Sequence, residues 1–248
     1  MQCLRRALDE LLEFLYPAGC RLCAAEPEDA AGLACAQHAL PAGLPGPRCG
    51  KCCAALPPML PHGRTCAPCK RRPLGLARVL ALADYRADAG AREWLLALKH
   101  GGRSDLAPIL GALLGQALAQ APPLGQQTPV LVPVPLHPWR LLERGYNQAD
   151  GLAQGAGSTC HWPVHSLLER VRPTPPQGAL GSPQRRANVA DAFRAVPRRA
   201  RRLAGRPVWL VDDVSTSGAT AQAAARALRR AGLGPVGLAV IAVAREAG

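Results

Sequence analysis

Apolar and polar positions change their spacing along the chain after about residue 73. From there on, short apolar runs of strand length alternate with longer stretches whose apolar residues recur at helical spacing. This alternation is typical of units that build a parallel sheet covered by helices. We expect strands at residues 79–85, 130–134, 164–168, 208–211 and 236–243, and helices at residues 89–100, 106–120, 147–155 and 221–231.

The preceding residues show a different pattern, with few large apolar side chains and many cysteines. Residues 1–16 carry leucines at helical spacing, but acidic residues interrupt them, so this stretch predicts an amphipathic helix and no export signal. The longest apolar run, residues 231–244, contains glycine and proline and is too short to span a bilayer. We therefore expect a cytoplasmic protein without membrane insertion, divided into residues 1–72 and 73–248.

Nine of the ten cysteines lie before residue 70, and most form pairs separated by two residues. Each pair can present two ligands from one tight turn, and two pairs make one tetrahedral zinc site. Disulfides fit less well because an export signal is absent, and a redox motif would need only one such pair. A crossed pairing, or His62 as a competing ligand, stays open on spacing alone. We expect two zinc ions, one held by Cys20, Cys23, Cys35 and His38 and one by Cys49, Cys52, Cys66 and Cys69.

Residues 208–220 join an apolar strand to two acidic residues and then to a small, hydroxyl-rich loop. In open α/β sheets ligands bind at the carboxyl ends of the strands, where adjacent carboxylates can accept hydrogen bonds from vicinal ribose hydroxyls. The loop can turn backbone N–H groups toward a phosphate at the start of the next helix. A need to cap the following helix would explain the hydroxyl residues, but it does not explain the whole order of strand, acidic pair and loop. The sequence predicts a sugar-phosphate site formed by Asp212, Asp213, Val214, Ser215, Thr216, Ser217, Gly218, Ala219 and Thr220.

This segment resembles the phosphoribosyl pyrophosphate (PRPP) signature of type I phosphoribosyltransferases. Three further stretches, residues 132–135, 144–148 and 184–188, the last leading into Phe193, together look like the ComF/GntX group of bacterial proteins. The resemblance covers essentially the whole chain. It implies an N-terminal helix and double zinc ribbon, followed by an α/β domain of the type I phosphoribosyltransferase fold with a mostly parallel sheet. His38 departs from relatives, which commonly have cysteine there.

The resemblance also implies a mechanism, in which pyrophosphate leaves the anomeric carbon of PRPP with the help of Mg²⁺. Asp212 and Asp213 would orient the ribose and hold the water shell of the ion. The turn at Val134 and Pro135 would bind the pyrophosphate. The arginines expected to contact the pyrophosphate are Arg144 and, from a loop, Arg185 and Arg186.

Basic charge is concentrated in residues 170–206, which contain ten arginines and one acidic residue within a chain of formal net charge +13. This concentration favours an anionic partner, either the pyrophosphate or a nucleic acid backbone. An arginine-rich composition can also leave many of these residues as solvated surface. Because the family is linked to competence and DNA uptake, single-stranded DNA and competence proteins are expected partners beside PRPP. Three functions stay open: a transferase with an unidentified acceptor, a PRPP-binding regulator without turnover, and a protein that handles single-stranded DNA.

Overall fold

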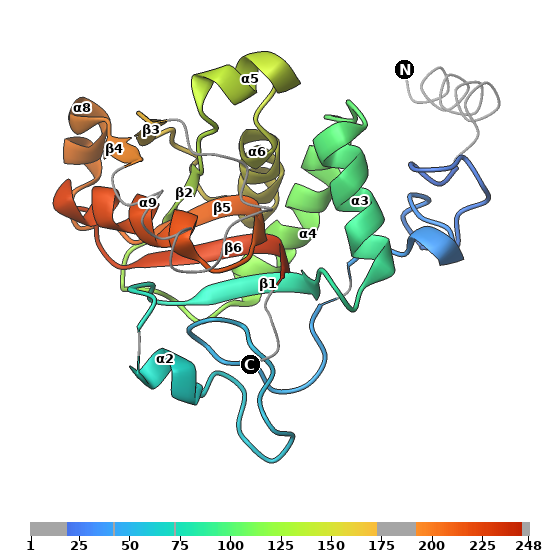
Figure 1. Ribbon diagram of the computed structural model, residues 1–248, viewed down its shortest axis with the longest axis horizontal. Coiled ribbons are helices and arrows are strands. Elements are labelled where there is room, and N and C mark those ends of the chain that lie inside the picture. The colour runs from blue at the N-terminus through green and yellow to red at the C-terminus, as the bar shows by residue number, and fades with distance from the viewer. Residues whose placement is uncertain (1–18, 42, 72, 173–191, 245–248) are drawn as a thin grey trace, which may run out of the picture.

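A four-stranded parallel sheet lies at the centre of the computed structural model, which describes residues 19–41, 43–71, 73–172 and 192–244 (Figure 1). The strands run in the order β1-β6-β5-β2, and each neighbouring pair is parallel. Their bounds are Val79–Asp84 for β1, Val130–Pro133 for β2, Val208–Ser215 for β5 and Val236–Val243 for β6. The predicted α/β fold with a central parallel sheet is confirmed.

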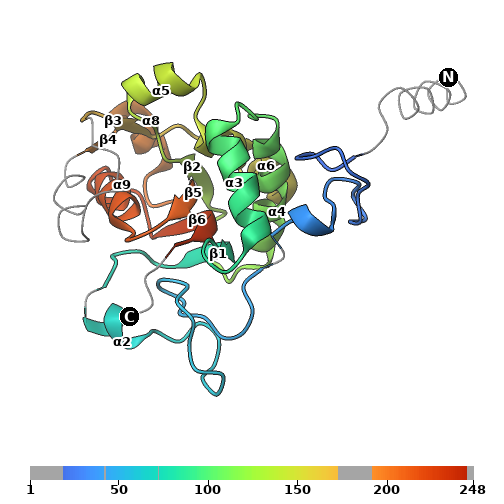
Figure 2. The same cartoon turned by 45° about the vertical axis from the view of Figure 1, so that its right-hand side comes forward.

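Both faces of this sheet are covered, because side chains alternate between two cores along the central strands. In β5, Val208 and Leu210 pack into one core, whereas Trp209 and Val211 pack into the other. The first core is covered by one long helix, α9 (Ala219–Arg230), and by a small antiparallel sheet of β3 (Leu168–Arg170) and β4 (Phe193–Ala195). The second is covered by α3 (Ala89–His100), α4 (Leu106–Gln120) and α6 (Gln148–Cys160) (Figures 1 and 2).

Hydrophobic spacing predicted the long elements well. The helices at residues 89–100 and 106–120 and the strand at residues 236–243 have the predicted bounds. The strand predicted at residues 208–211 continues to Ser215, so the acidic pair lies inside β5 near its end. The helix predicted at residues 147–155 begins one residue later and continues to Cys160. Residues 138–144 form a helix that the spacing did not indicate, α5 (Pro138–Arg144), with proline at its first position.

The strand predicted at residues 164–168 is wrong as one element. Val164 forms only an isolated parallel bridge with Leu131 of β2. His165 N still donates to Leu131 O, but Leu167 O already accepts a hydrogen bond from Val196 N, which directly follows β4. The chain instead leaves the central sheet, and Leu168 begins β3, which pairs with β4 beneath α9.

The cysteine-rich residues form two units on different sides of the α/β core (Figures 1 and 2). One contains the short helix η1 (Ala36–His38) and packs against α3. The other contains α2 (Ala67–Arg71) and lies beside β1, where Cys53 Sγ donates to Val79 O at 3.2 Å. Both units therefore contact the α/β part of the chain, and a domain boundary at residue 72 stays a prediction.

Some predictions fall outside the described residues, namely the helix at residues 1–16, most of the loop at residues 170–190, and Arg185 and Arg186. None of the helices within the described residues combines the length and apolar character that a membrane span requires.

Candidate functional site

The acidic pair lies at the carboxyl edge of the sheet, just beyond the end of β2. Pro133, the last residue of β2, pairs with Val211, so Asp212 and Asp213 extend past the neighbouring strand. Asp213 Oδ2 lies 3.1 Å from Nζ of Lys99, in the last turn of α3. Both acidic residues are partly buried. This arrangement leaves carboxylate oxygens at an edge where no neighbouring strand covers them on the β2 side.

Asp212 binds its proton more tightly than an ordinary aspartate. Burial, together with the negative charge of Asp213, raises the pKa of Asp212 to about 7. The positive charges of Lys99 and Arg170 act in the opposite direction. Without a bound cation or ligand, Asp212 is therefore about half protonated near pH 7, and a divalent cation bound beside it would favour its charged form.

A small hollow follows the acidic pair, at the start of α9. Gly218 has a φ of 75°, in the left-handed region, and directly precedes the first helical residue. The first N–H groups of α9 have no partner within the helix, so they can donate to an anion. Ser215 is buried in the wall of the hollow, and its Oγ has no hydrogen-bond partner among the described residues. An unsatisfied hydroxyl beside a helix N-terminus suits a phosphate group. The predicted loop residues that line the hollow are Val214, Ser215, Thr216, Gly218, Ala219 and Thr220, whereas Ser217 Oγ accepts a hydrogen bond from Ala219 N at 3.4 Å.

The predicted pyrophosphate turn lies beside the same edge of the sheet. Val134 is buried, and its N–H donates to Val211 O at 2.9 Å, which ties the turn to β5. Asn147 Nδ2 donates to Val134 O at 3.3 Å from the other side. Pro135 follows as the next residue, and Arg144 ends α5. Within the described residues Arg144 makes no ion pair with Asp212 or Asp213, so its role stays a prediction.

Two basic residues near the acidic pair were not predicted. Lys99 is one of only three lysines in an arginine-dominated chain, and that rarity was the available signal. Arg170 lies with its guanidinium carbon 5.4 Å from the centroid of the Phe193 ring, and burial lowers its pKa. Each reaches the acidic pair from an element distant in sequence, so spacing alone could not identify either of them.

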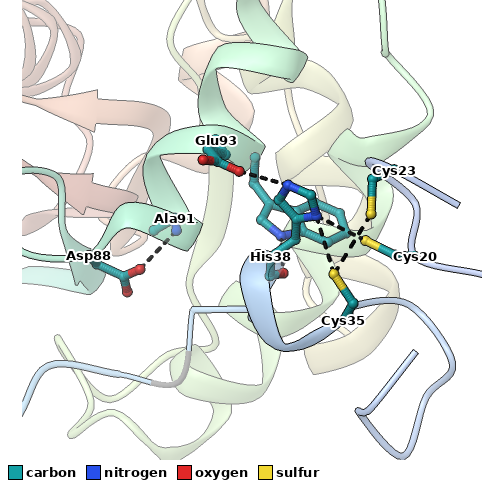
Figure 3. A network of polar contacts seen from close by, with 8 residues as sticks. Cys20, Cys23, Cys35, His38, Asp88, Ala91 and Glu93 are labelled. Carbon is teal, nitrogen blue, oxygen red and sulfur yellow. Dashed lines mark hydrogen bonds and ion pairs between the residues drawn. The ribbon is translucent and has the colours of Figure 1, made fainter. Parts of the chain in front are cut away.

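The first predicted metal-ligand group, near η1, forms as expected (Figure 3). Its four ligand atoms lie within 4.8 Å of one another, and His38 Nδ1 is 3.4 Å from Cys20 Sγ and 3.3 Å from Cys35 Sγ. Although burial favours the neutral thiol, hydrogen bonds from the backbone of Leu22 and Cys35 outweigh it and lower the pKa of Cys20 to about 6. Three sulfurs and one imidazole nitrogen are a donor set that suits tetrahedral zinc.

The imidazole of His38 is held from behind by α3. His38 Nε2 lies 2.8 Å from Glu93 Oε2, and Trp94 Nε1 donates to His38 O at 2.7 Å. Glu93 thereby favours the tautomer with its proton on Nε2, and Nδ1, which faces the sulfurs, is left free to bind a metal (Figure 3). A carboxylate behind a histidine ligand is a common arrangement in zinc sites, and it fixes both the ring and its protonation.

The second group lies beside α2 and contains sulfur ligands alone. Cys52 Sγ is 3.7 Å from Cys66 Sγ, and Cys66 N donates to Cys49 Sγ at 3.3 Å. Hydrogen bonds lower the pKa of Cys49 to about 7 against the effect of burial, whereas burial raises the pKa of Cys69. The ligands are thus grouped in the predicted sequential pairing, neither group includes His62, and both are compatible with structural zinc.

Comparison with known proteins shows that the chain is similar to proteins named for DNA utilization and competence. The DNA utilization protein YhgH of Escherichia coli O157:H7 is 34% identical over 196 residues, which are 77% of this chain and 80% of that protein. The same protein of Escherichia coli strain K12 is 33% identical over 195 residues with the same coverage. Competence protein F of Haemophilus influenzae is 36% identical over 104 residues, covering 42% of this chain and 45% of that protein. No family model matches the chain.

Solved structures resemble the chain only distantly. A glutamine PRPP amidotransferase from B. subtilis, in complex with ADP and GMP, has 21% identity and a TM-score of 0.37. The match covers 58% of this chain and 30% of the amidotransferase. The protein TT1426 from Thermus thermophilus has 22% identity and a TM-score of 0.32, over 56% of this chain and 81% of TT1426. At such identities and TM-scores these likenesses say nothing about activity.

Proposed function

Because the chain belongs to the ComF family of competence and DNA-utilization proteins, we propose that it binds PRPP together with Mg²⁺ at the carboxyl edge of its sheet. In this proposal Asp212 and Asp213 accept hydrogen bonds from the ribose hydroxyls, and the hollow from Ser215 to Thr220 binds the 5'-phosphate. One observation carries the proposal: Asp212 of the acidic pair, the buried Ser215 hydroxyl, which has no hydrogen-bond partner among the described residues, and the start of a long helix border one hollow.

The protein's residues would act by position and charge. Magnesium, when bound with PRPP, would neutralise charge on the leaving pyrophosphate. Asp212 and Asp213 would orient the ribose and hold the water shell of the ion, and Arg144 would bind pyrophosphate oxygens as a bidentate donor. Arg185 would add a second guanidinium, although it lies outside the described residues. In the absence of ligand, Lys99 would neutralise the negative charge of Asp213.

The two cysteine-rich groups would each hold one zinc ion with a structural role. A small segment with few large apolar side chains gains much of its folding free energy from such an ion.

Calorimetric titration of PRPP with and without Mg²⁺ tests the proposed site. We expect binding that requires the ion, and a loss of about a hundredfold in affinity in the double variant Asp212→Asn/Asp213→Asn, because each hydrogen bond to a charged group contributes about 1.5–3 kcal/mol. The variant Gly218→Val should also bind poorly, since a branched side chain resists the left-handed backbone that shapes this loop. A matched control is Glu26→Gln/Glu28→Gln, which removes the same charge from exposed positions in the cysteine-rich region.

Unchanged PRPP affinity in the acidic-pair variant would overturn the proposed site, provided that its melting temperature shows a folded protein. Turnover is a separate question. Release of pyrophosphate, assayed across a panel of nucleobases, separates a transferase from a regulator that only binds PRPP. Release that depends on one base would identify the acceptor, whereas binding without release across the panel would favour the regulator.

Single-stranded DNA binding is a second candidate function, favoured by a row of exposed arginines. The short helix α8 (Pro197–Ala200) and the turn η3 (Arg201–Leu203) carry Arg198, Arg199, Arg201 and Arg202, all exposed. Closely spaced guanidinium groups on one surface can bind successive phosphates of a strand without reading its sequence.

A further inference from the structure

A second hollow, of about 650 Å³, lies at the opposite end of α9 from the acidic pair. Its walls come from β4, from the two residues that follow β3, from α8 and η3, and from the end of α9. The acidic pair and the phosphate hollow lie at the start of α9, and a helix of 12 residues is about 18 Å long. Among the described residues, the two hollows share no lining residue. The second hollow is thus a separate feature of the surface.

Positive charge surrounds this second hollow. Arg172, Arg194, Arg201 and Arg230 line it from four different elements or their ends, and all four are exposed. None of the described residues that line it is acidic. Within the described part of the chain, Arg172, Arg194 and Arg201 make no ion pair or hydrogen bond through their side chains. Like charges gathered at one surface repel one another, so this surface favours a bound anion.

The floor of the hollow is apolar. Phe193, Ala195 and Ala227 are each less than a tenth exposed and form part of its lining, and Val171 contributes an exposed aliphatic side chain at its edge. A purely inorganic anion makes no use of such a floor. An arginine wall above an apolar floor matches a ligand that carries phosphates at one end and a flat, weakly polar group at the other.

We propose that this hollow binds a nucleotide, with the phosphates on the arginines and the base against the apolar floor. The volume lies within the roughly 300–1,000 Å³ range of small-molecule sites, and arginine forks bind phosphate oxygens in pairs. A DNA strand is the less suitable occupant, because the four arginines come from separate elements and surround a compact hollow instead of forming a row. The proposal does not depend on PRPP binding at the acidic pair.

Fluorescence anisotropy of a fluorescent ATP analogue, displaced by unlabelled ATP, tests this site. The background is Asp212→Asn/Asp213→Asn, in which the proposed PRPP site is disabled, so binding there reports the second hollow. We expect Arg194→Gln/Arg201→Gln to weaken ATP by about 10- to 100-fold, since each lost pair of charge-assisted hydrogen bonds contributes at least a factor of about ten. The matched control is Arg86→Gln/Arg92→Gln, which removes the same charge from exposed positions that do not line the hollow. We expect the control to stay within about twofold of the parent protein.

Four outcomes decide the matter. Loss in the hollow variant with retention in the control supports the proposal, and weaker competition by tripolyphosphate than by ATP supports a contribution from the base. Equal loss in both variants would reduce the effect to overall charge and would overturn it. Oligothymidine binding that depends on Arg194 and Arg201, without nucleotide binding, would assign the hollow to DNA and also overturn it. Failure of ATP to bind at millimolar concentration would do the same, without bearing on PRPP.

Discussion

Asp212 is the residue whose chemistry depends most on its surroundings. Burial and the neighbouring carboxylate disfavour its charge, whereas the N–H of Asp213 and the positive charges of Lys99 and Arg170 favour it. Such opposing influences are typical of residues that bind cations or handle protons. They also connect this carboxyl to the stability of the fold.

We predict that Asp212→Asn raises the melting temperature of the ligand-free protein, and raises it more at pH 8 than at pH 5. The folded pKa is raised to about 7, whereas the unfolded value is about 3.9. Between these two values the folded state holds a proton that the unfolded state has lost, so stability falls as pH rises through the folded pKa. Asparagine removes this cost, and each kcal/mol should appear as about 2–4 °C.

Differential scanning fluorimetry without PRPP or Mg²⁺ measures this effect, with Glu28→Gln as an exposed control that should change little at either pH. A destabilised Asp212→Asn variant, or an increase that is the same at both pH values, would show that the carboxyl is not held in its neutral form.

At the scale of single residues, the sequence could predict candidate sites whose residues lie close together in the chain. The acidic pair, the loop to Thr220 and the eight predicted metal ligands all lie in local sequence patterns, and the structure brings each set of predicted ligands together. Lys99 was missed because its contact with Asp213 spans more than a hundred residues of chain. Contacts of that kind depend on how helices pack. Hydrophobic spacing does not show which polar residues the packing brings together.

At the scale of elements, α3 connects more of the molecule than any spacing indicated. Its apolar side chains Trp94, Leu95 and Leu98 are fully buried against the sheet. Its first half contacts the η1 metal group through Glu93, and its last turn contacts the acidic pair through Lys99. Asp88 caps its start, where Oδ1 accepts a hydrogen bond from Ala91 N at 2.8 Å.

We predict that Glu93→Gln weakens zinc binding at the first metal group by about 10- to 100-fold, as loss of a partner behind a histidine ligand commonly does. The four-cysteine group should keep its affinity, so chelator titration should release one ion early and one late. Parent protein should contain two zinc ions by elemental analysis, and Cys49→Ser should lose the other one.

The control for this prediction is Glu28→Gln, an exposed carboxylate in the same unit that does not contact His38. Equal release of both ions in Glu93→Gln would show that the contact with His38 is incidental. A parent protein without zinc would contradict the metal assignment as a whole.

Elements of three turns or more were predictable because their apolar stripes repeat often enough to be recognised. Short elements were not. α5 has seven residues and leaves Trp139 and Leu142 largely exposed, so no buried stripe marks it. β3 and β4 have three residues each, and their pairing across a long intervening segment is a tertiary property.

At the scale of the whole molecule, the arginine-rich surface and the two cysteine-rich units lie around one central sheet. The α8–η3 arginines lie on the side of α9, whereas the η1 metal unit lies on the side of α3 (Figure 1). The sequence indicated both features but not their separation, because composition gives the amount of charge and not its position on the fold.

We predict that the protein binds single-stranded DNA and that the variant Arg198→Gln/Arg199→Gln/Arg201→Gln/Arg202→Gln flattens the dependence of log affinity on log salt. Each phosphate contact that is lost should reduce the slope by about 0.7 on single strands. Anisotropy of labelled oligothymidine across a salt series measures it. A control of equal charge change combines glutamine substitutions at four exposed positions elsewhere, Arg21, Arg64, Arg86 and Arg92.

An equal reduction in slope in both variants would show that the DNA binds elsewhere or that its binding depends on net charge alone. If no DNA binds even at low salt, the arginines of α8 and η3 are solvated surface. Because Arg199 Nη1 also donates to Ser166 O, a melting curve of the variant must accompany the binding data.

The position of α3 between two sites has a consequence for how the protein senses its environment. Glu93 and Lys99 are six residues apart, which is about 9 Å along a helix axis. Loss of the ion near η1 would free the start of this helix, and that movement would reach the lysine beside Asp213 through a rigid segment. In the proposed function, a protein depleted of zinc would therefore bind the activated sugar more weakly, because both sites would depend on the position of one helix.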